Sequence, residues 1–108
     1  MIKVCFFTEH GLLTGYEIKG HSGYAESDKD DIVCAAVSSA AYMAVNTITD
    51  VIGANADAKA GDGAMSLSLN QPDERAQAVL KGLELHLTEL SKQYPQNIRI
   101  IYGGVRNA

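Results

Sequence analysis

The sequence predicts an α/β fold, a two-layer sandwich of one mixed sheet and two helices in the order β-β-α-β-β-α-β. Short segments in which apolar and polar residues alternate, as they do in strands, occur in pairs. Each pair is followed by a longer segment whose apolar residues have helical spacing. The chain has 108 residues, 46% of them hydrophobic and 20% charged, which suits a globular protein with one core. We therefore expect a single domain over residues 1–108.

The first two strands are expected at residues 1–8 and 14–20, joined as a hairpin by a turn around Gly11. Their alternating apolar positions are Ile2, Val4 and Phe6 in the first strand and Tyr16 and Ile18 in the second. Residues 22–30 contain mostly glycine, serine and charged residues, so we expect an exposed loop there. This loop separates the hairpin from the first helix.

The first helix is expected to have Asp30 or Asp31 as its N-cap and to run to about Gly53. Its apolar stripe consists of Ile32, Val33, Ala36, Val37, Ala40, Ala44, Ile48 and Val51. Because many of these side chains are small, the helix axis can lie close to a sheet or to another helix. The sequence therefore predicts a buried helix that is also a candidate subunit contact.

The second half of the chain repeats the pattern of a hairpin followed by a helix. Strands are expected at residues 56–60 and 65–69, with a turn at residues 61–63. The second helix is expected to begin with Pro72 at its first position and to end at Pro95. A last strand is expected at residues 98–102.

Charge and cysteine content exclude several classes of function. A net charge of −4 with scattered basic residues argues against direct nucleic-acid binding, which needs a basic face. The two cysteines form no CxxC or zinc-type spacing, so no metal and no cofactor are expected. No apolar run is expected to reach the roughly 18 to 20 residues of a membrane span, and no signal region precedes the first strand. We expect a cytoplasmic protein without a membrane partner.

One histidine and one cysteine are the residues best suited to catalysis. His21 follows the second strand, and Cys34 is expected in the first turn of the first helix. A thiolate there would be favoured by the positive end of the helix dipole and by a nearby imidazole, and the same N-H groups suit an oxyanion. Gly20 and Gly23 flank His21 and let the backbone turn sharply, which suits a site. Together these residues are those of a cysteine nucleophile with a histidine base.

The same residues also have a structural interpretation, which the residues alone favour for Cys34, since cysteine often packs as a small hydrophobe. Asp31 has three possible roles: helix cap, orienting group for His21, or charge beside the thiol. Ser38, one turn after Cys34, is expected to pack or to bond a helix carbonyl. Tyr24 is a substrate contact or a loop anchor, and the second role is favoured.

The segment over residues 20–38, GHSGYAESDKDDIVCAAVS, resembles the signature of the ribosomal-processing cysteine proteases, the Prp family. The matching residues are Gly20, His21, Asp31, Val33, Cys34, Ala35 and Ser38. The opening strand, the small-residue helix and residues 94–99 extend the resemblance over nearly the whole chain. It implies a homodimeric α/β enzyme of the bacterial cytosol that removes a short N-terminal extension from a large-subunit ribosomal protein. Cys34 would be the nucleophile, His21 the general base and acid, and Asp31 the family's aspartate.

The loop between the two catalytic positions departs from the family pattern. Family members carry a glycine two residues before the aspartate and one residue fewer between histidine and cysteine. The loop that would order over the substrate, including Ser22, Gly23 and Tyr24, therefore differs here in length and charge. Two alternatives remain: a non-catalytic ribosome-assembly protein that uses the motif for packing, and a thiol redox sensor, which would need Cys5 close to Cys34.

Overall fold

The computed structural model describes residues 1–20, 28–61 and 63–104, and over residues 28–31 it describes the backbone alone. The elements are β1 (Ile2–Glu9), β2 (Leu12–Lys19), α1 (Asp28–Asn46), the π-helical segment η1 (Thr47–Ile52), β3 (Ala56–Gly61), β4 (Ala64–Leu69), α2 (Glu74–Gln93) and β5 (Ile98–Gly103). This order confirms the predicted β-β-α-β-β-α-β arrangement.

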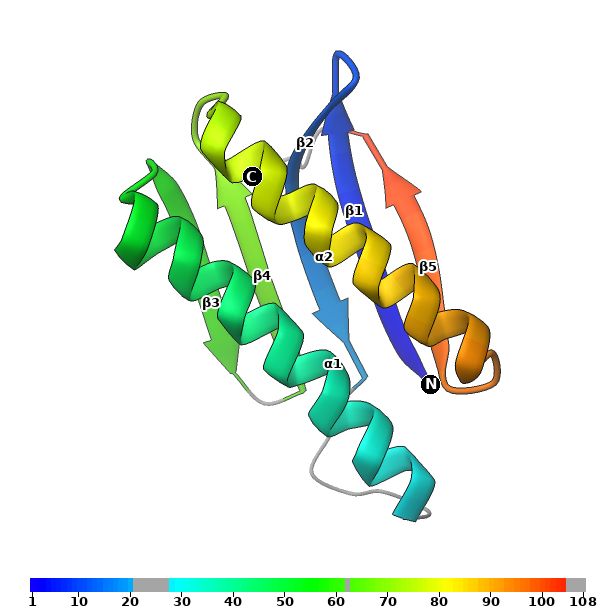
Figure 1. Cartoon of the computed structure of the whole chain (residues 1–108). Helices are drawn as coiled ribbons and strands as arrows, with labels where there is room; N and C mark the ends of the chain where they lie inside the picture. Colours follow the sequence, from blue (N-terminus) through cyan, green and yellow to red (C-terminus); the bar gives the residue numbers. More distant parts are fainter. Residues whose placement is uncertain (21–27, 62, 105–108) are drawn as a thin grey trace.

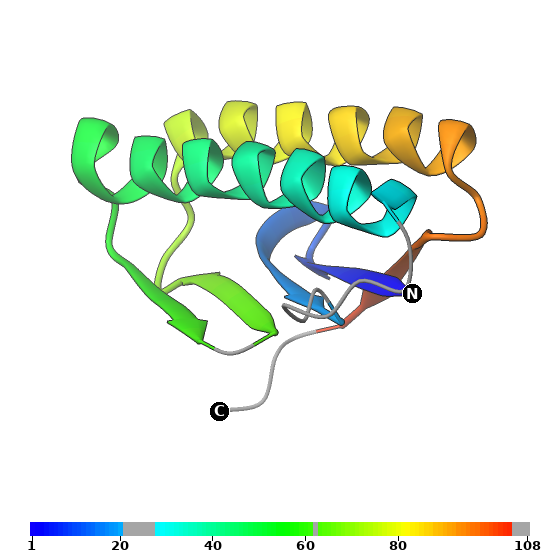
Figure 2. The same cartoon turned by 90° about the horizontal axis from the view of Figure 1, so that it is seen from below.

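The five strands form one sheet in the order β3-β4-β2-β1-β5. β1 pairs with β5 in parallel, and the other three pairings are antiparallel, so the sheet is mixed as predicted. Both helices lie side by side on one face of this sheet, as the two views in Figures 1 and 2 show. The predicted two-layer sandwich is confirmed.

The core lies between the sheet and the two helices. It contains the alternating residues predicted for the first two strands, which are all buried. From the helix layer it includes Val33, Val37, Ala41, Ala44, Val45, Ile48, Ala76, Leu80, Leu83 and Leu87. The other sheet face bears residues of opposite parity, such as Lys3 and Glu17, and these pair across strands with Lys19 and Cys5 respectively. Burial on one face only explains the strict alternation in the sequence.

The first helix differs from expectation at both ends. It begins at Asp28, so Asp30 and Asp31 lie inside its first turn and neither is the predicted N-cap. After Asn46 it continues as η1, where the Thr47 hydroxyl donates to the Met43 carbonyl at 2.7 Å. A hydroxyl bonded to a helix carbonyl competes with the regular i to i−4 pairing, which fits the wider π geometry. The predicted end is confirmed, because Gly53 caps the segment in a left-handed conformation.

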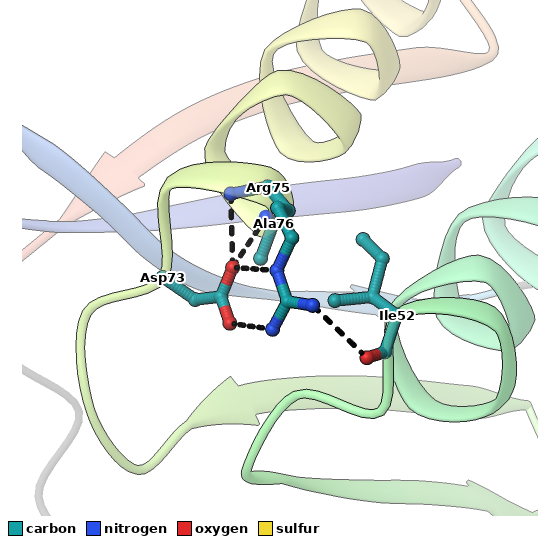
Figure 3. A network of polar contacts seen from close by, with 4 residues as sticks. All are labelled: Ile52, Asp73, Arg75 and Ala76. Carbon is teal, nitrogen blue, oxygen red and sulfur yellow. Dashed lines mark hydrogen bonds and ion pairs between the residues drawn. The ribbon is translucent and has the colours of Figure 1, made fainter.

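The second helix begins two residues later than predicted. Asp73, with extended backbone, is its N-cap and accepts hydrogen bonds from the N-H groups of Arg75 and Ala76. Pro72 therefore precedes the helix, because a carboxylate that satisfies two end amides is the stronger start signal. Arg75 also forms an ion pair with Asp73 and donates to the Ile52 carbonyl at the end of η1 (Figure 3). These contacts join the start of α2 to the end of η1.

The first helix also corrects an expectation about apolar length. The segment Ile32–Ile52 is long and apolar enough to cross a membrane by length and composition, contrary to the expectation that no run would reach this length. In the fold one face of this segment packs against the sheet and contributes core residues. Its outer face exposes Ile32, Met43 and Val51. It is therefore a core helix with an apolar outer surface.

Candidate active site

Cys34 lies in α1, half-buried, with its side chain packed against the core between the helix layer and the sheet. It is not part of a disulfide. Because α1 begins at Asp28, Cys34 is the seventh helical residue and lies in the second turn, so the predicted first-turn position is wrong. The free N-H groups and most of the dipole effect belong to the first turn. The helix end therefore offers a thiolate at Cys34 less stabilisation than the first-turn position would have given.

Gly20 follows β2 and is the residue immediately before His21. Its φ angle is 93°, and a β-carbon there would overlap with the carbonyl oxygen of Met1. Its N-H donates to the Gly63 carbonyl at 3.0 Å, in the turn before β4. Only glycine meets both demands. The backbone that leads into His21 is therefore fixed by the start of β1 and by the β3–β4 turn.

The fold brings part of the predicted site to one end of the molecule. Figure 1 shows the C-terminal end of β2 at the same end of the sheet as the first turns of α1. Asp31 is a residue of α1, one turn before Cys34. Ser38 lies one turn after Cys34 and is half-buried. The remaining predicted site residues are outside the described residues: His21, Ser22, Gly23 and Tyr24. Their roles, and that of Asp31, stay predictions.

The hydroxyl of Tyr16 is a structural feature that the sequence did not reveal. Tyr16, on β2, is fully buried, and its hydroxyl donates to the carbonyl of Ala41 on α1 at 3.0 Å. Burial raises the pKa of the Tyr16 hydroxyl, so the group stays a protonated donor. The alternating pattern identified Tyr16 only as a core position. The available signal was chemical, since a buried tyrosine hydroxyl usually finds a hydrogen-bond acceptor.

The second cysteine lies on the other side of the sheet. Val4 and Phe6 face the helices, so Cys5 between them faces the uncovered side, where it pairs across strands with Glu17. Burial and the Glu17 carboxylate raise the pKa of the Cys5 thiol. Because Cys34 packs against the core under the helices, the two cysteines lie on opposite faces of the sheet. This placement argues against a redox sensor in which Cys5 resolves an oxidised Cys34.

Comparison with known proteins identifies the family. The sequence profile described as cysteine protease Prp matches residues 1–99. This chain belongs to the Prp family. Its similarity to the ribosomal processing cysteine protease Prp of Bacillus subtilis is 26% identity over 109 residues, covering 93% of this chain and 96% of the relative. The resemblance of the segment over residues 20–38 is confirmed.

Solved Prp structures share this fold. The Prp of Staphylococcus aureus in complex with a substrate peptide has a TM-score of 0.86 to this chain, with 26% identity and coverage of 95% of this chain and 100% of that one. The same protease with a covalently linked product peptide has a TM-score of 0.82 and 28% identity, with coverage of 95% and 100%. Prp membership thus makes this chain a cysteine protease, as the sequence predicted.

Proposed function

We propose that this Prp protein removes a short N-terminal extension from a large-subunit ribosomal protein, with Cys34 as nucleophile and His21 as general base and acid. The observation that carries the proposal is the signature over residues 20–38. Its cysteine lies on α1, whose first turns are at the same end of the sheet as the end of β2 that leads into its histidine. The relatives named as ribosomal processing proteases, one solved with a substrate peptide, support the substrate class.

The chemistry follows from the two side chains. His21 takes the proton of the Cys34 thiol, and the thiolate attacks the scissile carbonyl carbon. The carbon–nitrogen bond then breaks, and the protonated His21 gives its proton to the leaving amine. This leaves a thioester between Cys34 and the N-terminal part of the substrate. Water, deprotonated by His21, hydrolyses that thioester and regenerates the thiol.

Substrate binding would use the segment after Gly20 and one edge of the sheet. An extended peptide can add to an exposed edge strand, and β3 and β5 are the two edges here. We propose that residues 22–27, including Ser22, Gly23 and Tyr24, contact the bound peptide. Residues 28–30, which the sequence assigned to this loop, belong instead to the first turn of α1. Because this loop differs from the family pattern in length and charge, we expect the difference to change which cleavage sequence the enzyme prefers.

The outer face of the helix layer supports a homodimer. Residues 32–49 contain no charged side chain, although Ile32, Tyr42 and Met43 are exposed on α1. A groove of about 780 Å³ runs between α1 and α2, lined by Ala36, Ser39, Ala40, Met43, Ala44, Thr47, Ala78, Val79, Gly82, Leu83, His86 and Leu90. In a two-fold dimer the same surface of each copy contacts the other, so that surface must contain both a protruding side chain and a groove that receives it. The exposed Met43 is the protruding side chain, and the groove that it lines is the recess. We place the second copy here.

We also propose that the enzyme is cytoplasmic and contacts neither a membrane nor nucleic acid directly. The apolar segment Ile32–Ile52 uses one face for the core and, in this proposal, the other for the second copy. The net charge of −4 disfavours contacts with phosphate groups.

The experiment uses the ribosomal protein of the same organism with its native N-terminus. Cys34→Ala is expected to abolish cleavage, read by mass spectrometry of the new N-terminus, while circular dichroism remains that of the wild type. Cys5→Ala removes the other thiol, which lies on the sheet face away from the helices, and is the matched control that is expected to keep cleavage. Full cleavage by Cys34→Ala would overturn the assignment of Cys34 as the nucleophile. No cleavage by the wild type would favour the non-catalytic, assembly-protein interpretation of the motif.

A further inference from the structure

We propose that Tyr16 is a positioning residue for the catalytic pair, because its hydroxyl ties the strand that leads into His21 to the helix that carries Cys34. The observation is the buried hydrogen bond of 3.0 Å from the Tyr16 hydroxyl to the Ala41 carbonyl. This inference rests on the His21–Cys34 pair of the proposed function and adds a third residue to it.

The two ends of this bond are close, along their elements, to the two catalytic positions. Ala41 follows Cys34 by seven residues, which is two helical turns or about 10 Å along the axis, so both residues lie on nearly the same side of α1. Tyr16 lies on β2 four residues before Gly20, whose backbone is held by Met1 and Gly63. A shift of α1 relative to β2 would therefore move Cys34 relative to the backbone entering His21.

Such a bond can fix the position of the helix because the core-facing side chains of α1 are short. Among the described residues of α1, those buried in the core are all valine or alanine: Val33, Val37, Ala41, Ala44 and Val45. Small apolar side chains give close packing but little interlocking along the axis, since dispersion contacts are not directional. A hydrogen bond has a required distance and angle, and this one lies in the dry core. It can thus set both the sliding and the rotation of α1.

The tyrosine itself is firmly held. Its side chain has no exposed surface, and its ring lies 6.4 Å from the ring of Phe6 on the neighbouring strand β1. The hydroxyl therefore has little freedom to follow a displaced helix. Tyr16→Phe keeps the ring and its packing, and the Ala41 carbonyl keeps its place in the helical hydrogen-bond pattern. The variant is expected to fold and to lose only the directional constraint.

The test uses the full chain and compares Tyr16→Phe with a matched variant. Tyr102→Phe also removes a tyrosine hydroxyl bond, at 2.7 Å to Glu84, but that bond joins β5 to α2 and does not involve α1. The readout is the rate of Cys34 alkylation by iodoacetamide from pH 5 to 10, resolved from Cys5 by peptide mass spectrometry. It is measured well below the melting temperature of each variant, together with kcat and KM on the substrate peptide.

We expect Tyr16→Phe to move the Cys34 alkylation profile toward the higher pH of an ordinary thiol and to lower kcat by about tenfold with little change in KM. Tyr102→Phe is expected to leave the profile unchanged. If Tyr16→Phe lowers the melting temperature but keeps the wild-type profile and kcat, Tyr16 is structural only and the proposal is overturned while the catalytic pair stands. An ordinary thiol profile in the wild type would instead remove the catalytic pair, and this proposal with it.

Discussion

The α-carbon of Gly20 faces the carbonyl oxygen of Met1 so closely that no β-carbon fits between them. The residue before His21 therefore lies against the residue that precedes β1, and it also donates a hydrogen bond to Gly63. Gly20, which the sequence identified as a position where the backbone can turn sharply beside the site, also approaches Met1 closely and donates a hydrogen bond to Gly63. Its glycine is required by space as well as by its φ angle of 93°.

Gly20→Ala is therefore expected to lower the free energy of unfolding by more than the roughly 1–2 kcal/mol that a left-handed conformation costs an L-residue. Gly53→Ala is the matched control, because Gly53 also has a positive φ of 73°, but a β-carbon there would meet no atom of another described segment within 4 Å. Urea denaturation of both variants measures the difference. If both variants lose the same free energy of unfolding, the backbone at Met1 moves away from the added β-carbon without an energetic penalty.

Met43→Glu is expected to convert the proposed dimer to monomers. Met43 is 69% exposed and lines the groove between α1 and α2, so the substitution places a charge in a surface segment that has none. Burying an unpaired carboxylate disfavours association strongly. Ile101→Glu, on the sheet face away from the helices, is the control. Analytical ultracentrifugation measures the molar mass in solution. If Met43→Glu has the same molar mass as a dimeric wild type, the dimer interface does not include this groove.

The two thiols are expected to differ in reactivity at neutral pH. The pKa of Cys5 is raised above its usual value, by burial first and by the Glu17 carboxylate second, so less thiolate forms there at neutral pH than on an ordinary thiol. Cys34 is expected to be alkylated first. Glu17→Gln removes the second cause and should speed alkylation of Cys5, whereas Glu9→Gln, at the far end of the same hairpin, should not. Peptide-resolved mass spectrometry after brief iodoacetamide treatment distinguishes the two sites.

The Asp73 carboxylate predicts an acid-dependent loss of stability. The hydrogen bond from the Arg75 side chain and the backbone N-H of Ala76 lower the pKa of Asp73. The folded state therefore binds fewer protons here than the unfolded chain, so this contribution is complete above the unfolded pKa of about 4 and is lost as the pH falls through the lower folded pKa. Asp73→Asn keeps an N-cap acceptor without the titration.

The melting temperature of Asp73→Asn should accordingly change less than that of the wild type between pH 4 and pH 2.5. Asp57→Asn removes an exposed carboxylate on β3 and serves as the control, with a pH dependence like that of the wild type. If the melting temperatures of the wild type and Asp73→Asn change equally with pH across this range, the contacts between Arg75 and Asp73 in Figure 3 do not form in solution.

Several parts of the candidate site followed from local sequence. The alternation from Ile2 to Phe6 and around Ile18 identified the strands, because one sheet face is buried and the other is not. The segment over residues 20–38 identified the family and predicted His21 and Cys34 as the catalytic pair. Helix ends were less accurate. Residues 28–31 contain three aspartates, so composition offered several equivalent starts, and the true start moved Cys34 from the first turn to the second.

The sequence by itself determined the types and order of the strands and helices and predicted the catalytic pair, because periodicity and motif spacing are local properties of the chain. The tertiary structure alone decided which segments meet: Tyr16 with Ala41, Gly20 with Met1 and Gly63, and Cys5 on the sheet face opposite Cys34. These contacts depend on the strand order β3-β4-β2-β1-β5 and on how α1 lies across it. No local pattern encodes that order, because it results from burying all the apolar faces together.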